Sequence, residues 1–530
     1  MKNIHICLLV AGLLTLGSCS KDFLDSEPIT DVTDTNFYKT PEDAYDALIG
    51  CYDGMQIASG GIGGLSFPVA SEVLSDDCFG GVGNSDGFGF QAVDEFDKSR
   101  SPADVNLFSN NWTQYYRAIY RVNVLLQKME QIDWTGNDDL RLQYESEARF
   151  IRAHMYFEMV RLWGNIPLLT EPSSENLPQS APEEVYKVIA EDLVYAAENL
   201  PDASLAAADF GRVTKWAAEA YVARVYLYYT GYYGASDLVG VVSKAQALSY
   251  LEDVIANSGH SLLDNFASLW PAASTLDGTY AGEVNPEILF SVRHTYTSDY
   301  NGNTDGNHWM VMFGMREFTY YPYATGWGVT VTPSLWDAYS ETDTRRGASI
   351  ISVDDEDIPF DKIGSQREYT GYYNKKYSPM SDEDGNSVTV GVGGTDFQIG
   401  QFQDYVVMRY SDVLLMAAEL GSPNAQTYFN QVRQRALKSD YVQIPVNTQN
   451  IMKERQLEFA LEGLRYWDLL RQGVSTAAST IAVSTEVMNG GVTVSKTISA
   501  SKIQETMGLQ QIPNDQITLS NGVLQQNAGW

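Results

Sequence analysis

Cysteine and histidine are scarce in this chain, which has four cysteines and five histidines in 530 residues. No Cys-x-x-Cys or His-Glu-x-x-His spacing occurs, so the sequence predicts no zinc site of the common types. Cys7 and Cys19 belong to an N-terminal segment that we expect to be processed. Cys51 and Cys78 can form one disulfide bond or remain buried thiols, and two cysteines in so long a chain are no disulfide framework.

Basic residues are also few. The chain has 35 lysines and arginines against 68 acidic residues, and its formal net charge is −33 at pH 7. Such a negative field repels nucleic acids and other polyanions, and it favours neutral or cationic ligands. Hydrophobic residues still make up 44% of the chain and aromatic residues 12%, which argues against disorder and predicts a large core.

Enzyme signatures are absent: the chain has no Gly-x-Ser-x-Gly, no Walker loop and no Gly-x-Gly-x-x-Gly. His154 lies in a helical pattern and is expected to pack or cap rather than act as a base. Asp382, Asp384 and Asn386 resemble the start of a calcium loop, but the glycine is misplaced and the bidentate glutamate is missing. We therefore predict no catalytic residue, no metal site and no cofactor.

The N-terminus carries the longest apolar run, residues 6–14, which follows a charged start and is too short to span a membrane. The run leads into residues 16–19, Leu-Gly-Ser-Cys, which resemble a bacterial lipobox. We expect residues 1–18 to be a signal peptide, Cys19 to carry lipid such as palmitate, and residues 19–40 to form a tether to the membrane. An ordinary secretory signal with an incidental cysteine is the alternative.

Helical periodicity dominates both ends of the chain, and the centre is irregular. Pro41 follows Thr40, a candidate cap, at one helix start. Within residues 215–228, alanines alternate with large aromatic residues, which suits the close helix packing of tetratricopeptide hairpins. The further predicted helices cover residues 112–132, 140–163, 182–200, 214–229, 243–257, 406–420, 425–437 and 451–471.

Seven segments spread over nearly the whole chain carry a recognisable pattern: residues 22–25, 162–168, 214–228, 409–419, 430–436, 454–471 and 526–530. These segments resemble motifs of the SusD/RagB family of nutrient-binding outer-membrane lipoproteins, and they occur in the order typical of that family. The terminal Gln-Asn-Ala-Gly-Trp departs slightly, since Ala528 stands where the family usually has proline.

This resemblance implies a mainly α-helical fold, in which four tetratricopeptide-like hairpins form a scaffold for a loop-rich ligand-binding lobe. The expected division is an N-terminal helical part at 41–268, the loop-rich region at 269–402 and a C-terminal helical part at 403–530. The resemblance also implies a partner, a SusC-like TonB-dependent barrel of the outer membrane, which the lipoprotein covers as a lid. The acidic residues after Cys19 resemble a tether for export to the cell surface.

Charged residues recur at three- and four-residue spacing between Glu454 and Arg465. This spacing predicts neighbouring positions on a helix and ion pairs of about a few tenths of a kcal/mol each. We interpret these residues as structural. A buried acid pair for hydrolysis is the alternative.

Aromatic side chains and glycines become dense in the loop-rich region. A sugar ring presents apolar C–H faces and a rim of hydroxyl groups, so a binder needs flat aromatic surfaces and a few polar partners. Trp327, which stands between two glycines, is the favoured stacking platform, and the alternative is that it plugs the seam between lobe and scaffold. The predicted ligand-binding residues of this region are Tyr296, Trp309, Tyr320, Tyr321, Tyr323 and Trp327.

A second polar cluster lies in the glycine-rich segment 75–90. Short acidic side chains on such a loop can accept hydrogen bonds from sugar hydroxyl groups. In the family, loops before the helix that corresponds to Trp112 help to line the ligand site. We therefore predict Asp77, Asn84 and Asp86 as ligand-binding residues, with turn capping as the alternative.

The sequence thus predicts a cell-surface lipoprotein that captures an oligo- or polysaccharide without catalysis and delivers it to its transporter. We expect dissociation constants between micromolar and millimolar, or about −8 to −4 kcal/mol. A lid for peptides or other nutrients is the first alternative. A surface glycoside hydrolase is the second.

Overall fold

The computed structural model describes residues 37–60, 65–202, 209–299 and 301–530. The predicted signal peptide at 1–18, the lipidation at Cys19 and most of the tether lie outside these ranges.

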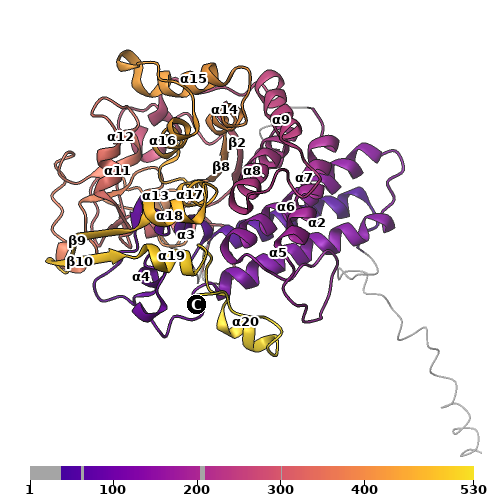
Figure 1. Ribbon diagram of the computed structural model, residues 1–530, viewed down its shortest axis with the longest axis horizontal. Coiled ribbons are helices and arrows are strands. Elements are labelled where there is room, and N and C mark those ends of the chain that lie inside the picture. The colour runs from indigo at the N-terminus through magenta and orange to yellow at the C-terminus, as the bar shows by residue number, and fades with distance from the viewer. Residues whose placement is uncertain (1–36, 61–64, 203–208, 300) are drawn as a thin grey trace, which may run out of the picture.

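Helices of the N-terminal part form one half of the molecule, drawn from indigo to magenta in Figure 1. From α5 to α9, each helix packs on the next, and α2 packs on α5 and α6. This succession of neighbouring helices confirms the predicted mainly α-helical, tetratricopeptide-like architecture. The helices of this half are α2 (Pro41–Gly60), α5 (Ser109–Lys128), α6 (Asp138–Trp163), α7 (Pro182–Asn199), α8 (Lys215–Tyr233) and α9 (Lys244–Asn257). Helix α3 (Phe67–Val73) lies in the other half and packs on α17 (Arg465–Leu470).

Local sequence explains where these helices begin and how they pack. The Thr40 hydroxyl accepts a hydrogen bond from the Asp43 amide at 3.3 Å, as expected of a cap at the start of α2. In α8, Ala217, Ala218 and Ala220 are at most 1% exposed, so their small side chains let neighbouring helices approach closely.

The C-terminal part continues this array, because α14 packs on α9. Strand β8 (Tyr405–Arg409) pairs antiparallel with β2 (Ile288–Val292) and connects the centre of the chain to these helices. The helices are α14 (Tyr410–Glu419), α15 (Ala425–Leu437), α16 (Thr448–Phe459), α17 (Arg465–Leu470), α18 (Val474–Ile481), α19 (Ala500–Glu505) and α20 (Asn514–Leu519).

Two of the predicted helices are wrong in part. Residues 406–409 form strand β8 because this fully buried apolar run finds a partner strand in β2. The helix predicted at 451–471 breaks between α16 and α17, where Leu461 and Gly463 have φ values of 67° and 76°. Such values lie outside the helical region, so the chain turns there.

The loop-rich lobe consists of short elements, and in the described ranges the strands form five two-stranded sheets. Several pairs join distant segments: β1 (Cys78–Phe79) pairs with β5 (Thr330–Val331), and β6 (Ile350–Ser352) with β7 (Tyr372–Asn374). The hairpin of β9 (Val483–Asn489) and β10 (Val492–Ile498) lies at the outer edge of the lobe (Figure 1). Other short elements are α4 (Gly89–Asp94), α10 (Pro271–Ser274), β3 (Met315–Arg316), β4 (Thr325–Gly326), α11 (Pro333–Ala338), α12 (Arg346–Ser349), α13 (Val388–Gly391), and the 3₁₀ turns η2 (Lys98–Arg100), η5 (Phe266–Leu269), η6 (His308–Met312) and η7 (Ile363–Ser365). Two further 3₁₀ turns extend helices of the scaffold: η3 (Met129–Gln131) follows α5, and η8 (Lys438–Asp440) follows α15.

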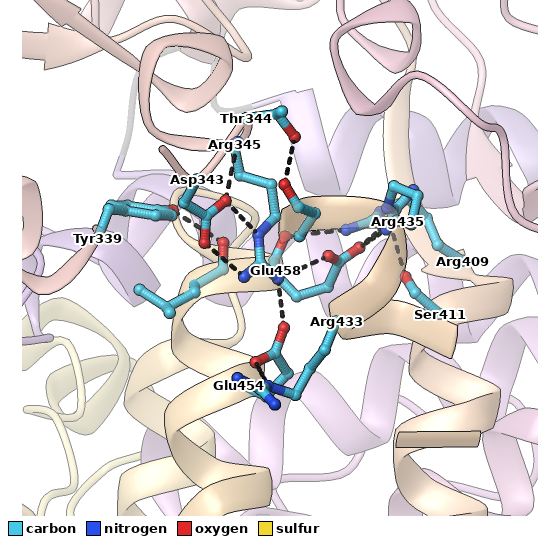
Figure 2. A network of polar contacts seen from close by, with 12 residues as sticks. Tyr339, Asp343, Thr344, Arg345, Arg409, Ser411, Arg433, Arg435, Glu454 and Glu458 are labelled. Atoms are coloured by element: carbon cyan, nitrogen blue, oxygen red, sulfur yellow. Dashed lines mark hydrogen bonds and ion pairs between the residues drawn. The ribbon is translucent and has the colours of Figure 1, made fainter. Parts of the chain in front are cut away.

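A network of buried ion pairs joins α16 to the segments around it (Figure 2). Glu458 is 0% exposed and accepts hydrogen bonds from Arg345 at 3.1 Å, from Arg409 at 2.9 Å and from Arg435. These arginines come from the start of α12, the end of β8 and α15, respectively. Glu454, one turn earlier, adds a second contact to Arg345 at 2.6 Å. One helix is thereby tied to three other elements.

The charge pairs predicted between 454 and 465 are therefore different from those in the structure. The side chains do not pair along one helix; each contacts a residue from another segment. Arg455 binds Asp412, and Arg465 binds Asp76 at 2.7 Å. The reason is that α16 is packed among α14, α15 and α17, so its charged side chains face other elements.

Cys51 and Cys78 are both buried free thiols, so they do not form the disulfide bond that the sequence left open. His154 is also buried, and its Nδ1 lies 2.6 Å from the Tyr221 hydroxyl. Burial lowers the pKa of His154 to about 3, as expected for a packed neutral histidine. In the part of the chain that the structure covers, no helix is long and apolar enough to cross a membrane.

Candidate functional site

Two of the predicted ligand-binding residues, Asp86 and Trp327, come together around Arg316. The Arg316 Nη1 lies 3.2 Å from Asp86 Oδ2, and its guanidinium carbon lies 5.5 Å from the centre of the Trp327 ring. Asn84 lies in the same turn as Asp86 and is exposed. We call Asn84, Asp86, Arg316 and Trp327 the Arg316 cluster.

A buried arginine, Arg367, fixes the backbone of the turn that carries Asn84 and Asp86. Arg367 donates hydrogen bonds to the carbonyl oxygens of Asn84 at 3.1 Å, Asp86 at 2.6 Å and Gly87 at 2.9 Å. The Asp86 carboxylate accepts the Gly83 amide proton at 2.9 Å and closes the turn. Because its backbone is fixed at several points, the turn presents its side chains in a preformed arrangement.

Trp327 is positioned by two closely approaching backbone segments. Strands β3 and β4 pair in parallel, and the Trp327 amide donates to the Val311 carbonyl at 2.6 Å. A Cβ atom at Gly326 would lie 2.4 Å from the Gly314 Cα, so this approach requires glycine. Gly328 has a φ of 91°, which also favours glycine. The two glycines that flank Trp327 therefore serve the backbone, and the indole is half-buried.

Exposed aromatic side chains lie on the segments that form the cluster. Phe88, which is 42% exposed, follows Asp86, and its ring lies 3.9 Å from the guanidinium carbon of Arg367. Tyr320, which is 41% exposed, and the half-buried Tyr321 lie in the loop between β3 and β4. These rings add apolar surface to the two segments that carry the polar groups of the cluster.

The β9–β10 hairpin closes one side of the site. A Cβ atom at Gly490 would lie 2.5 Å from the Asn84 Nδ2, so the hairpin turn reaches the Asn84 side chain. Lys496 on β10 lies 2.9 Å from Asp94 and 2.8 Å from Glu368. Burial alone would lower the pKa of Lys496, but these carboxylates raise it, so the buried ammonium stays charged and anchors the hairpin.

Three predicted residues lie in the core instead. Trp309 is 1% exposed, and its ring packs edge-on against Tyr377 at 4.7 Å. Tyr323 is 3% exposed and donates to Glu356 at 2.6 Å; Asp77 is 0% exposed and accepts from Gln456 at 2.8 Å. The structure corrects these three assignments, because none of the side chains presents a surface to a ligand.

Tyr296 is 38% exposed and lies away from the site just described. Its ring packs edge-on against Phe402 at 6.4 Å, beside the segment 394–400. In the ranges covered by the structure, no contact joins it to Arg316.

Arg316, Arg367 and Phe88 were not predicted. One signal for Arg316 was present, because it is the only lysine or arginine between Arg293 and Arg345, in a segment rich in aromatic residues. No sequence pattern predicts the role of Arg367, because the carbonyl groups that it binds lie 280 to 283 residues earlier in the chain.

The arrangement suits binding of a polar ligand with a flat apolar face. A half-buried indole supplies a stacking surface, Arg316 supplies donors, and Asp86 and Asn84 supply acceptors and an amide. The Asp86 carboxylate is already engaged by Arg316 and by the Gly83 amide. Within the described ranges, no group of three or more His, Cys, Asp or Glu side chains is placed to hold a metal ion.

Two family models match the chain. Residues 356–530 match the SusD family, and residues 83–227 match a family described as starch-binding and associating with the outer membrane. The chain is 26% identical to SusD-like protein P38 of Formosa agariphila, over 89% of this chain and 91% of that protein. It is 25% identical to a SusD-like protein of Bacteroides ovatus, over 89% and 82%.

Solved structures agree. A laminarin binding SusD-like protein is 28% identical, with a TM-score of 0.74 over 93% of this chain and 100% of that chain. Surface glycan-binding protein A from Bacteroides thetaiotaomicron, in complex with laminarihexaose, is 22% identical and has the same fold, with a TM-score of 0.72 over the same shares of both chains. The motifs in order and the helical scaffold agree with both family models: residues 356–530 match the SusD family, and the chain as a whole is similar to SusD-like proteins.

Proposed function

We propose that this protein is a surface glycan-binding protein that captures a saccharide at the Arg316 cluster and does not cleave it. The main observation in support of the proposal is that Arg316 contacts both Asp86 and Trp327 in the loop-rich lobe. This combination of a ring face with a guanidinium and a carboxylate group matches the C–H faces and hydroxyl rim of a sugar. A relative of 28% identity is named for laminarin binding, so laminarin is the first ligand to test.

Titration with a glycan panel that includes laminarin and starch tests this function. We expect at least one glycan to bind with a dissociation constant between about micromolar and millimolar, because shallow stacking and exposed hydrogen bonds give modest free energies. Incubation of the same glycan with the protein should release no new reducing ends. Release of reducing ends would establish a hydrolase, and binding of peptides but of no glycan would establish a different cargo.

We further propose that Cys19 carries the lipid that holds the protein on the outer membrane. The support is the lipobox-like sequence 16–19 and the outer-membrane association in the description of one matching family. Replacing Cys19 by alanine should move the protein from the membrane fraction to the soluble fraction, since acyl chains supply about 0.8 kcal/mol per buried CH₂ group. The melting temperature should not change. Partitioning of the variant into detergent like the wild type would contradict the lipid anchor.

The partner that we propose is a SusC-like, TonB-dependent barrel, to which the captured glycan passes. The resemblance of the whole chain to SusD proteins supports this proposal. Purification of the native, membrane-held protein in mild detergent should recover a barrel transporter with it. Migration of the protein alone across several mild detergents would count against a lid.

A further inference from the structure

A cavity lies in the helical half of the molecule, away from the Arg316 cluster. It has a volume of about 350 Å³, within the range typical of small-ligand sites. Helix α2, from Tyr45 to Gln56, forms one wall, the segment 209–212 forms another, and the end of β2 with the residues after it forms a third. In Figure 1, α2 lies on the right, whereas the β9–β10 hairpin beside the Arg316 cluster lies at the far left.

Gln56 gives the cavity an unused hydrogen-bond acceptor. The residue lines the cavity and is 8% exposed, and its Nε2 donates to the Thr304 carbonyl at 3.1 Å. Its Oε1 has no hydrogen-bond partner among the residues that the structure describes. A buried acceptor without a partner needs an explanation, and a hydrogen-bond donor on a ligand in the cavity would supply one.

The charges around the cavity are mostly negative. Arg212 contacts Glu147 at 2.6 Å and Asp209 at 3.2 Å, so its charge is already matched by carboxylates. Arg293, which follows β2 and lies against the 209–212 segment, is 3.0 Å from Asp404.

Two more carboxylates, Asp53 and Asp305, line the cavity. Asp53 pairs with Arg121, and both of these side chains are exposed. Burial and the charge of Asp53 raise the pKa of Asp305. Three carboxylates, Asp53, Asp209 and Asp305, and two arginines line the cavity, so the lining favours a cationic ligand over an anionic one.

Aromatic rings supply the apolar part of the cavity. Tyr45, Tyr52 and Phe210 line it. The Tyr52 hydroxyl donates to Glu147 at 2.6 Å and accepts the Val213 amide proton at 2.8 Å, so the polar end of this residue is occupied. Its ring remains as an apolar wall. A ligand body with an apolar face would pack against these rings.

We infer that this cavity binds a small ligand that carries a protonated amine on a body about the size of a disaccharide or dipeptide. The ammonium group contacts the Asp305 carboxylate and the free Oε1 of Gln56, and the body packs against the tyrosine and phenylalanine rings. An amino sugar and the N-terminus of a short peptide both supply this chemistry. The site is separate from the glycan site proposed above and does not depend on it.

Matched pairs of probes test this inference by calorimetric titration of the full protein. Glucosamine and glycyl-phenylalanine amide carry the amine, and N-acetylglucosamine and N-acetyl-glycyl-phenylalanine amide are their neutral counterparts. We expect at least one amine to bind at least tenfold more tightly than its neutral counterpart, and the amine that binds identifies the source. Equal binding of both members of each pair, or binding of neither amine, would overturn the inference.

Variants locate the binding. Asp305→Asn should weaken amine binding at least tenfold and leave the melting temperature and glycan binding unchanged, because the amide keeps the shape of the side chain. Asp384→Asn, which removes an equal charge from an exposed turn, should leave amine binding unchanged. Trp327→Ala should also leave it unchanged, so failure of the glycan site and failure of this one are distinguishable. Amine binding that survives Asp305→Asn would show that the amine binds elsewhere.

Discussion

Replacing Glu458 by glutamine should lower the free energy of unfolding by about 3–5 kcal/mol, the loss typical when one partner of a buried ion pair is removed. The carboxylate neutralises charge from Arg345, Arg409 and Arg435, and none of these guanidinium groups is more than 6% exposed. Burial alone would raise the pKa of Glu458, but the three guanidinium groups lower it well below its usual value. Glutamine keeps the shape and loses the charge, so it leaves positive charges buried together.

The lowered pKa of Glu458 also predicts how the free energy of unfolding of the wild type depends on pH. Because the folded-state pKa of Glu458 is lowered, the ionised carboxylate stabilises the fold at pH values above its unfolded-state pKa of 4.5. This stabilisation is lost as the pH falls toward the folded-state pKa. Urea unfolding at pH 7 and at successively lower pH measures both effects. The difference between the wild type and Glu458→Gln should shrink as the pH falls.

A surface ion pair is the control for this experiment. Glu130 pairs with Arg141, and its side chain is 78% exposed. Glu130→Gln should cost less than about 1 kcal/mol, because water screens such pairs. If Glu458→Gln costs no more than Glu130→Gln, the network in Figure 2 does not hold α16 in place.

Replacing Trp327 by alanine should weaken glycan binding by about 1–3 kcal/mol, the range for burying a large apolar side chain. This corresponds to about 5- to 150-fold in the dissociation constant. The indole is half-buried and lies beside Arg316, so the variant loses the stacking face and keeps the hydrogen-bonded backbone of β3 and β4. Titration with the glycan that binds best, together with a thermal melt, measures affinity and stability separately.

The matched control is Tyr296→Ala, which removes an exposed ring that no described contact joins to Arg316. Its affinity for the glycan should stay within about twofold of the wild type, since binding energy concentrates in few contacts. A large fall in melting temperature with retained affinity in Trp327→Ala would show that Trp327 plugs the seam between lobe and scaffold. The stacking assignment would then be wrong.

Helices with strong periodicity were predictable, and elements that depend on a distant partner were not. Helix α15 runs from Ala425 to Leu437, as predicted, and α7 differs by one residue at its end. Residues 406–409 also fit a helical pattern, but pairing with β2, more than 100 positions earlier, makes them a strand. Local sequence carries no information about that partner.

The site shows the same division. Trp327 was predicted from local composition, and Asp86 from its glycine-rich loop and the family resemblance; the structure brings both to Arg316. Trp309 and Tyr323 share that composition and are buried, because Tyr377 and Glu356, from other parts of the chain, cover or bind them. In a region without regular periodicity, the exposure of an aromatic ring is decided by long-range packing, which composition cannot indicate.

The β9–β10 hairpin is synthesised after the other segments of the site, so the site is complete only once this hairpin has been made. The Gly490 amide donates to the Gln366 carbonyl at 2.8 Å, and the Glu368 amide donates to Asn489 at 2.7 Å, so the hairpin braces the segment that holds the Asn84 turn. This hairpin is made after more than nine tenths of the chain. A chain whose translation stops before β9 therefore lacks this wall of the site.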